Sequence, residues 1–308
     1  MKRTLLATAV SLAAAYSAST YAQLEEVIVT AQKKDELLSE APVAVNVIGA
    51  QQIEEFSVFQ ADELSKLTAG LDIRYEGDTN TGVGLRGVGT FSQQAAPARV
   101  GTYLDDYYMA SQATVALGGM YDMANVQILR GPQGTLYGQP SPTGAMIMTT
   151  ANPDLSEVTG YVQGSVVDPE GYNLQGAVSF PLIENKLAIR IAALTDKRET
   201  GIENIVRSET DERGRDAFRI KALWEPTDNL SMLLGYHRIE TEKSDLHRIV
   251  ETIDPALANF NVQADDRYAI GDAPSIMNKK EDDFYTFKLD WAIGDIDVSW
   301  FSGLLSAK

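Results

Sequence analysis

Four stretches in the second half of the chain alternate apolar and polar residues with the period of a β-strand. Residues 172–180 place Tyr, Leu, Gly, Val and Phe on one set of positions and Asn, Gln, Ala and Ser on the other. Residues 216–225, 230–237 and 285–291 repeat this alternation. Because successive side chains of a strand point to opposite faces, each stretch predicts one apolar and one polar face. We expect about seven such strands between residues 157 and 308.

The connections between these strands are predicted to differ in length. Short turns are expected at residues 183–185, 226–229 and 294–295, and long loops at residues 200–212 and 242–281. Soluble β-sandwiches also alternate, but outer-membrane barrels combine short turns at one end with long loops at the other. The pattern therefore predicts antiparallel strands that cross a membrane with their apolar faces toward lipid.

A compact domain of mixed α and β structure is predicted before these strands. Strands are expected at residues 42–48, 71–75 and 125–130, and a short amphipathic helix at residues 61–67. The segments between them are rich in glycine, which permits tight turns. The predicted fold class is thus an α+β domain followed by antiparallel transmembrane β-barrel strands.

One glycine-rich segment, residues 82–87, matches the GxGxxG spacing of dinucleotide-binding folds. That fingerprint must open a helix whose N-terminus holds the pyrophosphate. Gly89, Thr90 and Pro97 would interrupt such a helix, so we interpret the glycines as turn residues and predict no dinucleotide site.

The N-terminus has the features of a secretory signal peptide. Lys2 and Arg3 form a positively charged start, and residues 5–15 form an apolar run. Residues 20–22 then form the small-residue cleavage site that a secretory signal requires. A membrane anchor would need about 20 apolar residues. We therefore expect cleavage after Ala22.

A β-branched island, Val27-Ile28-Val29, lies in the polar tail that follows. Such an island can add as a strand to the open edge of a partner's sheet, where main-chain hydrogen bonds supply the affinity. It can equally be a frayed strand of the following domain, and the pattern alone leaves both readings open.

The charge and cysteine content narrow the class of protein. The formal net charge of -17 argues against a nucleic-acid partner, which would need a basic face. The chain has no cysteine, so no disulfide stabilises the fold, as fits a periplasmic or outer-membrane protein.

No catalytic residue, metal site or cofactor is predicted. The only two histidines, His237 and His247, have no second ligand at zinc-like spacing and are interpreted as a lumen-facing residue and a loop residue. The acidic pairs Glu25-Glu26 and Asp105-Asp106 are interpreted as solvated, because a catalytic pair also needs a pocket and opposed environments.

Four motifs give the chain a resemblance to a known family. They are EEVIVTAQ at 25–32, LRGVGT at 85–90, YLDDYYM at 103–109 and VQILRGPQGTLYG at 126–138. In this order they resemble the TonB box and plug motifs of TonB-dependent outer-membrane receptors. The resemblance identifies the TonB box, which binds the inner-membrane protein TonB, with Glu25, Glu26, Val27, Ile28, Val29, Thr30 and Ala31. It identifies the plug motif with Arg86, Gly87, Arg130, Gly131, Pro132, Gly134, Tyr137 and Gly138.

The resemblance implies four segments. They are a signal peptide at 1–22, a TonB-box segment at 23–40, a plug domain at 41–153 and the N-terminal part of a β-barrel at 154–308. The family's barrel has about 22 strands, so we expect an incomplete barrel from a truncated record or a defective gene. An open edge would leave backbone groups unpaired in hydrocarbon, so these strands alone are not expected to form a working pore.

The implied function is energised uptake of a scarce ligand across the outer membrane of a Gram-negative bacterium, with lipid and TonB as partners. Ferric siderophores are the family default, while haem, cobalamin and oligosaccharides stay open. Phe91 and Tyr108 are expected in ligand-facing plug loops, placed to stack on the ligand, and Arg99 to pair with an anionic chelate. A soluble periplasmic protein would lack the lipid-facing alternation, and a passive porin would lack the box and plug.

Overall fold

The computed structural model describes residues 28–29, 36–37, 44–76, 80–89, 98–109, 120–137, 141–168, 170–204, 209–245, 268–269 and 276–307. The chain divides into two compact units, Met1–Ala41 and Pro42–Lys308. In the first unit, β1 (Ile28–Val29) pairs antiparallel with β2 (Glu36–Leu37). The predicted signal peptide lies outside the described residues.

The second unit begins with the expected mixed domain, residues 44–150. Its elements are β3 (Ala44–Gly49), α2 (Ala50–Glu55), η1 (Ala61–Glu63), α3 (Leu64–Leu67), β4 (Leu71–Glu76), β5 (Asn80–Leu85), β6 (Val88–Gly89), β7 (Val100–Leu104), β8 (Tyr107–Tyr108), β9 (Met123–Arg130), α5 (Gly134–Tyr137) and β10 (Gly144–Thr150). One sheet has the order β3-β9-β10-β7-β8, with β10 parallel to β7 and antiparallel to β9. A second has the order β4-β5-β6. The three predicted strands and the predicted helix are confirmed, the helix as η1 followed by α3.

The GxGxxG segment forms a β-hairpin. Strand β5 ends at Leu85, and the turn residues Arg86 and Gly87 have φ values of 55° and 78°. Two central residues with positive φ are typical of the tight turns that match strand twist. The prediction that these glycines serve a turn is confirmed for Gly87 and wrong for Gly82 and Gly84, which lie within β5.

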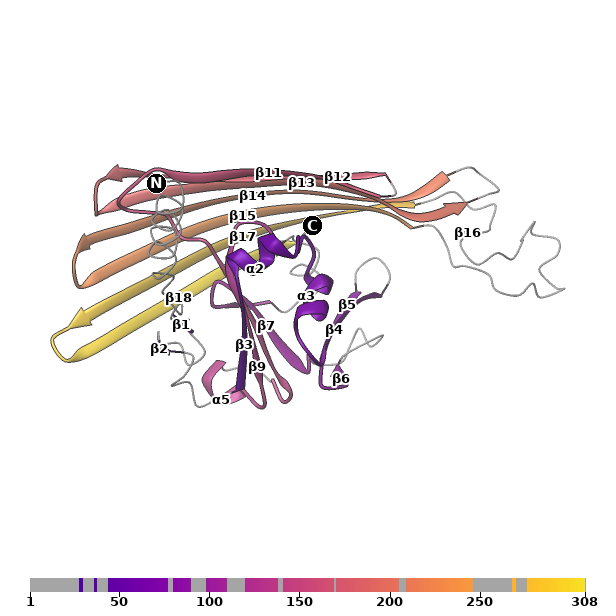
Figure 1. The fold of residues 1–308 in the computed structure, drawn as a ribbon. Coiled ribbons are helices and arrows are strands. Elements are labelled where there is room, and N and C mark those ends of the chain that lie inside the picture. The colour runs from indigo at the N-terminus through magenta and orange to yellow at the C-terminus, as the bar shows by residue number, and fades with distance from the viewer. Residues whose placement is uncertain are drawn as a thin grey trace, which may run out of the picture. The chain divides into compact units, whose positions relative to one another are not determined.

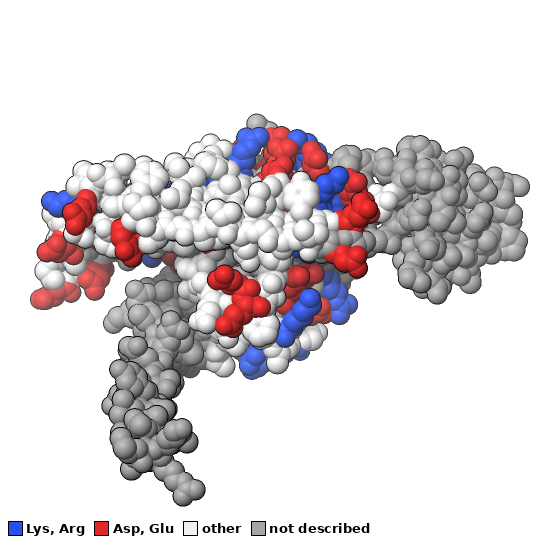
Figure 2. All heavy atoms as spheres, turned by 45° about the horizontal axis from the view of Figure 1, so that its top comes forward, with Lys and Arg blue, Asp and Glu red and all other residues white. Residues whose placement is uncertain are grey.

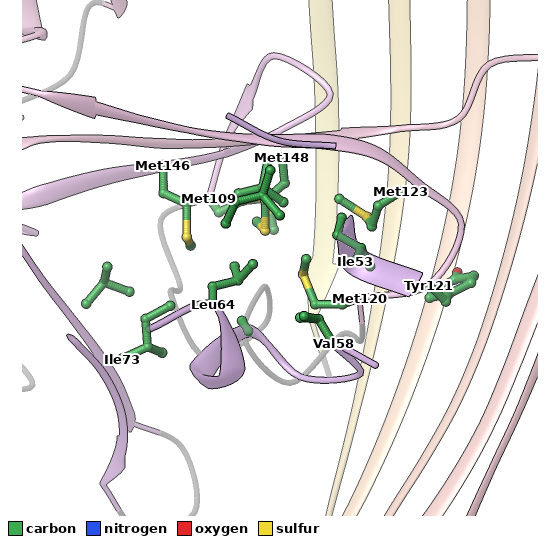
Figure 3. Packing of buried hydrophobic residues seen from close by; sticks show 14 of the residues in the cluster. Ile53, Val58, Leu64, Ile73, Met109, Met120, Tyr121, Met123, Met146 and Met148 are labelled. Carbon is green, nitrogen blue, oxygen red and sulfur yellow. The ribbon is translucent and has the colours of Figure 1, made fainter. Parts of the chain in front are cut away.

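The apolar core of the mixed domain is built from several elements and is rich in methionine. Ile53 of α2 and Leu64 of α3 pack with Met120, Met146 and Met148 (Figure 3). Unbranched methionine side chains fill irregular space between short elements. The same cluster includes residues of the sheet that follows: Ala177, Ala192, Leu194, Ala217, Ile239 and Phe284.

The rest of the second unit is a sheet of long antiparallel strands, called the wall below (Figure 1). Its strands are β11 (Thr159–Val167), β12 (Gly171–Ile183), β13 (Leu187–Asn204), β14 (Glu209–Thr227), β15 (Leu230–Asp245), β17 (Ile276–Ile293) and β18 (Ile296–Ala307). A short strand, β16 (Tyr268–Ala269), pairs parallel with β13. The seven long strands follow one another in chain order, which agrees with the predicted number.

The predicted connections are confirmed in part. Tight turns join β12 to β13, β14 to β15 and β17 to β18, and a long connection separates β15 from β17. The predicted long loop at 200–212 is wrong, because β13 extends to Asn204 and β14 begins at Glu209. Beyond the apolar band, charged side chains such as Lys197 and Glu212 pair across strands, 2.8 Å apart from Nζ to Oε2. The strands therefore continue after the apolar alternation stops.

The two faces of the wall differ as predicted. In β12, Tyr172, Leu174 and Val178 are exposed on one face, while Asn173 and Gln175 are buried on the other. Cross-strand rows on the outer face are apolar, for example Phe180, Ile189, Ala222, Leu234 and Phe287. Figure 2 shows this outer face as a band without charge, with acidic and basic residues gathered toward its ends. Within the described part of the chain, no helix is both long and apolar enough to cross a membrane.

Candidate functional site

The inner face of the wall is polar and is covered by the mixed domain. Its buried polar and charged side chains are Asn173, Gln175, Ser179, Asp196, Arg215, Arg219, Lys221, His237 and Asp282. Buried charges are costly unless they are paired and hydrogen-bonded. Three groups of contacts that satisfy most of these side chains form the candidate functional site.

The first group centres on the turn between β7 and β8. Asp105 and Asp106 have φ values of 47° and 67°, a left-handed pair that closes the hairpin between two adjacent strands. Aspartate tolerates this conformation better than most residues. The turn therefore presents two carboxylates next to each other.

Asp105 is held in a buried ion pair with the wall. Its carboxylate accepts hydrogen bonds from the backbone N–H of Thr150 at 2.8 Å and from Thr150 Oγ1 at 2.6 Å. Lys221 Nζ lies 3.3 Å from Asp105 Oδ2, with only 1% of the lysine side chain exposed. Burial alone would raise the pKa of Asp105, but the charge of Lys221 and the hydrogen bonds from Thr150 outweigh it and lower the pKa to about 2. Asp105 is thus a permanent anion at neutral pH.

The interpretation of the Asp105-Asp106 pair as solvated is wrong for Asp105, whose side chain is 9% exposed. The hairpin tip points at the wall, and the cations that receive it lie more than a hundred residues later in the chain. Asp106 is closer to the prediction. It pairs with Lys288 at 3.4 Å, and the two side chains are 25% and 41% exposed.

The second group centres on Asp122, which precedes β9. Arg190 Nε lies 3.0 and 3.1 Å from its two carboxylate oxygens, and the backbone N–H of Asp122 donates to the hydroxyl of Tyr161 at 3.0 Å. Arg219 Nη1 donates to the carbonyl oxygens of Tyr121 and Asp122 at 3.2 and 3.3 Å. The Arg219 guanidinium also stacks on the Tyr121 ring, 4.3 Å from its centre. Two wall arginines therefore bind one short segment of the mixed domain.

His237 links the first two groups. Its Nδ1 accepts a hydrogen bond from Arg219 Nε at 3.0 Å, and its Nε2 lies 3.8 Å from Asp105 Oδ2. The side chain is buried on the inner face of β15, which confirms the lumen-facing interpretation. His247 lies outside the described residues.

The third group centres on Phe59, between α2 and η1. Arg215 Nη2 approaches its carbonyl oxygen at 3.5 Å, and the Arg198 guanidinium lies 5.8 Å from the centre of its ring. Asp196 positions Arg215, with Nη2 to Oδ2 at 2.7 Å, and accepts a hydrogen bond from Asn173 at 3.0 Å. The wall therefore also reaches the N-terminal part of the mixed domain.

A cavity of about 300 Å³ lies beside these contacts. Its lining includes Ile53 and Val58 of the mixed domain and Tyr161, Gln175 and Arg190 of the wall. The α2 region thus has empty space next to it on the side of the wall.

Only part of the predicted TonB box is described. Ile28 and Val29 form β1 and pair with Leu37 and Glu36 inside the first unit. The other box residues lie outside the described residues: Glu25, Glu26, Val27, Thr30 and Ala31.

The predicted plug-motif residues lie at turns of the mixed domain. Arg86 begins the β5–β6 turn, and Arg130 ends β9, where its Nη2 donates to the carbonyl oxygen of Ala69 at 3.2 Å. Gly131 has a φ of 98°, which favours glycine, and Pro132 separates it from α5. Gly134 and Tyr137 bound α5, Gly87 lies in the first turn, and Gly138 is outside the described residues.

Two of the three predicted ligand-facing residues are described. Phe91 lies outside the described residues. Arg99 is exposed at the start of β7, where its carbonyl oxygen accepts hydrogen bonds from Thr143 at 2.5 and 3.2 Å. Tyr108 is half-buried in β8, with its ring centre 5.5 Å from that of Tyr103.

The mixed domain matches a known family model. The model for the TonB-dependent receptor plug domain covers residues 38–145. Among curated proteins, a pesticin receptor of Yersinia pestis is 32% identical over 162 residues, 52% of this chain and 24% of that protein. A ferrioxamine receptor of Yersinia enterocolitica is 25% identical over 232 residues, 67% of this chain and 29% of that protein. The chain thus spans 24% and 29% of the length of these two relatives.

The wall and mixed domain together match solved receptor structures. The ferric yersiniabactin uptake receptor FyuA of Yersinia pestis superposes with a TM-score of 0.72 at 22% identity, over 85% of this chain and 40% of that one. The siderophore receptor PiuA of Acinetobacter baumannii gives 0.68 at 18% identity, over 88% and 37%. At these identities the superpositions show a shared fold. Residues 38–145 thus match the TonB-dependent receptor plug domain, and the described chain shares the fold of these receptor structures.

Proposed function

We propose that this chain supplies the plug and barrel strands of an outer-membrane receptor that imports a ferric siderophore with energy from TonB. The mixed domain is the plug, and the wall contributes strands to a transmembrane barrel of about 22 strands. The protein acts in the outer membrane of a Gram-negative bacterium and is a transporter rather than an enzyme. The named cargoes and functions of its relatives, yersiniabactin, ferrioxamine and siderophore uptake, support this cargo class.

The observation that carries the proposal is the contrast between the two faces of the wall. The outer face is apolar and uncovered, as a lipid-facing surface must be. The inner face is polar, and the mixed domain is bound to it through Asp105, Asp122 and Phe59. A domain held inside a barrel partly by polar contacts closes the lumen, and water can satisfy these polar groups when the domain moves.

The TonB-box segment would transmit the force. A strand that pairs through its main chain, such as Ile28–Val29 with β2, can pair in the same way with an edge strand of TonB. Ligand occupancy would favour the state in which this segment is released. It would do so only to the extent that the ligand binds the released and unreleased states with different affinity.

Replacing Ile28 by proline in the full-length receptor tests this function. Proline removes the backbone N–H that strand addition needs, so uptake should be lost while surface binding persists. Ferric yersiniabactin and ferrioxamine, each labelled with radioactive iron, are the probes, and uptake by energised cells is compared with binding to chilled cells. Ile28→Leu keeps the N–H and is the matched control.

Three results would count against the proposal. Ile28→Pro could take up ligand at the wild-type rate, or Ile28→Leu could lose uptake to the same degree. Haem, cobalamin or an oligosaccharide could also be imported while no ferric siderophore is, which would retain the receptor mechanism but replace the cargo class.

A further inference from the structure

Methionine is concentrated in one part of the mixed domain. Five of the chain's eight methionines lie between residues 109 and 148, and all five belong to the same buried cluster. Met109, Met146 and Met148 are each 1% exposed and are enclosed by the core, where a flexible side chain fills irregular space. Met120 and Met123 have different surroundings, and packing alone does not account for them.

Met120 and Met123 both line the cavity of about 300 Å³ beside α2, and the other three methionines of the cluster are not part of its lining. Figure 3 shows the two side chains near Ile53 of α2. The cavity reaches the surface beside this helix, where Ala50 and Glu54 of its lining are exposed. A side chain that served only to fill space would not leave a cavity beside it. The cavity therefore gives small solutes a route to these two thioether groups.

The same two methionines flank the segment that two wall arginines bind. The chain runs Met-Tyr-Asp-Met from 120 to 123, and the two central residues are the ones that Arg190 and Arg219 contact. The backbone N–H of Met120 also donates to the carbonyl oxygen of Phe59 at 3.4 Å. A change of polarity at either methionine therefore acts directly on a contact between the mixed domain and the wall.

A thioether is oxidised by a peroxide in one two-electron step. The sulfur attacks one oxygen of hydrogen peroxide, so that an S–O bond forms while the O–O bond breaks. The leaving hydroxide takes up the proton of the transferred oxygen and departs as water. The cavity admits such a molecule, because a water molecule occupies only about 30 Å³ of liquid volume. The product, methionine sulfoxide, is polar and disrupts apolar packing.

The wall side of the cavity offers hydrogen-bond donors to a sulfoxide. Gln163 and Gln175 line it, and Gln175 Nε2 donates to Gln163 Oε1 at 3.0 Å. Within the described part of the chain, the amide N–H groups of Gln163 make no hydrogen bond. A sulfoxide oxygen in the cavity can accept from these groups, whereas the apolar core would leave it without a partner. Oxidation on the cavity side therefore changes how residues 120–123 pack.

We propose that Met120 and Met123 form an oxidation site at which peroxide loosens the contact between the mixed domain and the wall. The two thioethers are the reacting groups, the cavity admits the oxidant, and the segment between them transmits the change to Arg190 and Arg219. The site acts on the seat of the mixed domain, so the inference does not depend on which ligand is imported.

The first test locates the oxidised residues. Full-length receptor in outer-membrane vesicles is treated with hydrogen peroxide, then unfolded, digested and analysed by mass spectrometry. Sulfoxide should form at Met120 and Met123 before it forms at Met146 and Met148, because susceptibility follows exposure. Equal rates at all four positions, or earlier oxidation of Met146 and Met148, would overturn the inference. This measurement uses the unmodified receptor, so it is decisive even where a variant is unstable.

The second test measures the effect on the seat. Hydrogen exchange of amides in α2 and β9, which both border the cavity, should be about tenfold faster after peroxide treatment. Met120→Leu combined with Met123→Leu removes both thioethers and nearly keeps their volume, so peroxide should then leave exchange unchanged. Met146→Leu combined with Met148→Leu is the matched control and should retain the acceleration. Acceleration that persists in the first double variant, or is absent from the control, would refute the proposed site.

Discussion

Replacing Asp105 by asparagine should loosen the contact between the mixed domain and the wall. The substitution keeps the size and the left-handed turn but leaves Lys221 buried without its counter-charge, 3.3 Å away. Removing one partner of a buried ion pair typically costs about 3–5 kcal/mol. Because asparagine can still accept the hydrogen bond from the Thr150 N–H, the lower value of about 3 kcal/mol is expected.

Hydrogen exchange of backbone amides in β7 and β10 of the full-length receptor measures this loss, since both strands flank Asp105 and Thr150. Local opening that is easier by about 3 kcal/mol speeds exchange by roughly a hundredfold. Adding Lys221→Met to Asp105→Asn removes the stranded charge and should recover much of the protection, because an uncharged buried pair is often as stable as the ion pair.

Asp106→Asn supplies the matched control in the same turn. Its partner Lys288 is 41% exposed, and an exposed ion pair is worth at most about 1 kcal/mol. Exchange in β7 and β10 should therefore change by less than about fivefold. Equal effects of the two substitutions, or a double variant that is less protected than Asp105→Asn alone, would refute the assignment of Asp105 as the buried anchor.

Three further predictions follow from the described contacts. The pKa of Asp105 is about 2 in the folded state, against an ordinary value of 3.8. The ionised carboxylate therefore contributes about 2 kcal/mol to the free energy of unfolding above pH 4, and this contribution is lost as the pH falls toward 2. Asp105→Asn should make the free energy of unfolding less dependent on pH over that range. Gly303→Val should accelerate exchange of β8 amides, because a side chain there overlaps the Tyr107 ring and overpacking costs about 1–3 kcal/mol; unchanged exchange would contradict this contact. Leu234→Lys should destabilise the receptor in lipid vesicles by about 2–4 kcal/mol in urea unfolding, and an effect near zero would show that this outer face does not meet lipid.

The sequence was sufficient to predict the fold wherever a local pattern of residues decides the structure. The alternation over residues 172–180 predicted both faces of β12, and Gly87 was correctly assigned to a turn, since Gly89 and Pro97 exclude a helix. Each of these inferences depends on residues within one or two elements. The period of apolar and polar residues and the residue types that favour turns are local properties, so they can be read from a single sequence.

The buried contacts could not be predicted because they depend on strand register. Asp105 and Lys221 are 116 positions apart, and nothing near either residue specifies the other. The signal that exists is indirect: Arg219, Lys221 and His237 occupy polar positions of strands whose other face is apolar. Basic side chains on the inner face require buried anions as partners. An aspartate pair at a hairpin tip of the mixed domain was a candidate for these anions.

The ion pairs that accompany apolar packing between the wall and the mixed domain fit a domain that has to move. An apolar plug surface would be held by burial energy of about 25 cal/mol per Å² and would expose that surface to water each time it shifted. A contact made through Asp105, Asp122 and Phe59 contributes little net stability relative to an apolar one, because desolvation offsets much of each attraction, but it specifies one seated position. Once these ion pairs are broken, water can satisfy the polar groups on both sides, and only the smaller apolar part of the contact is exposed at a cost. The inner face of the wall is therefore suited both to seat the mixed domain and to line an aqueous path after the domain moves.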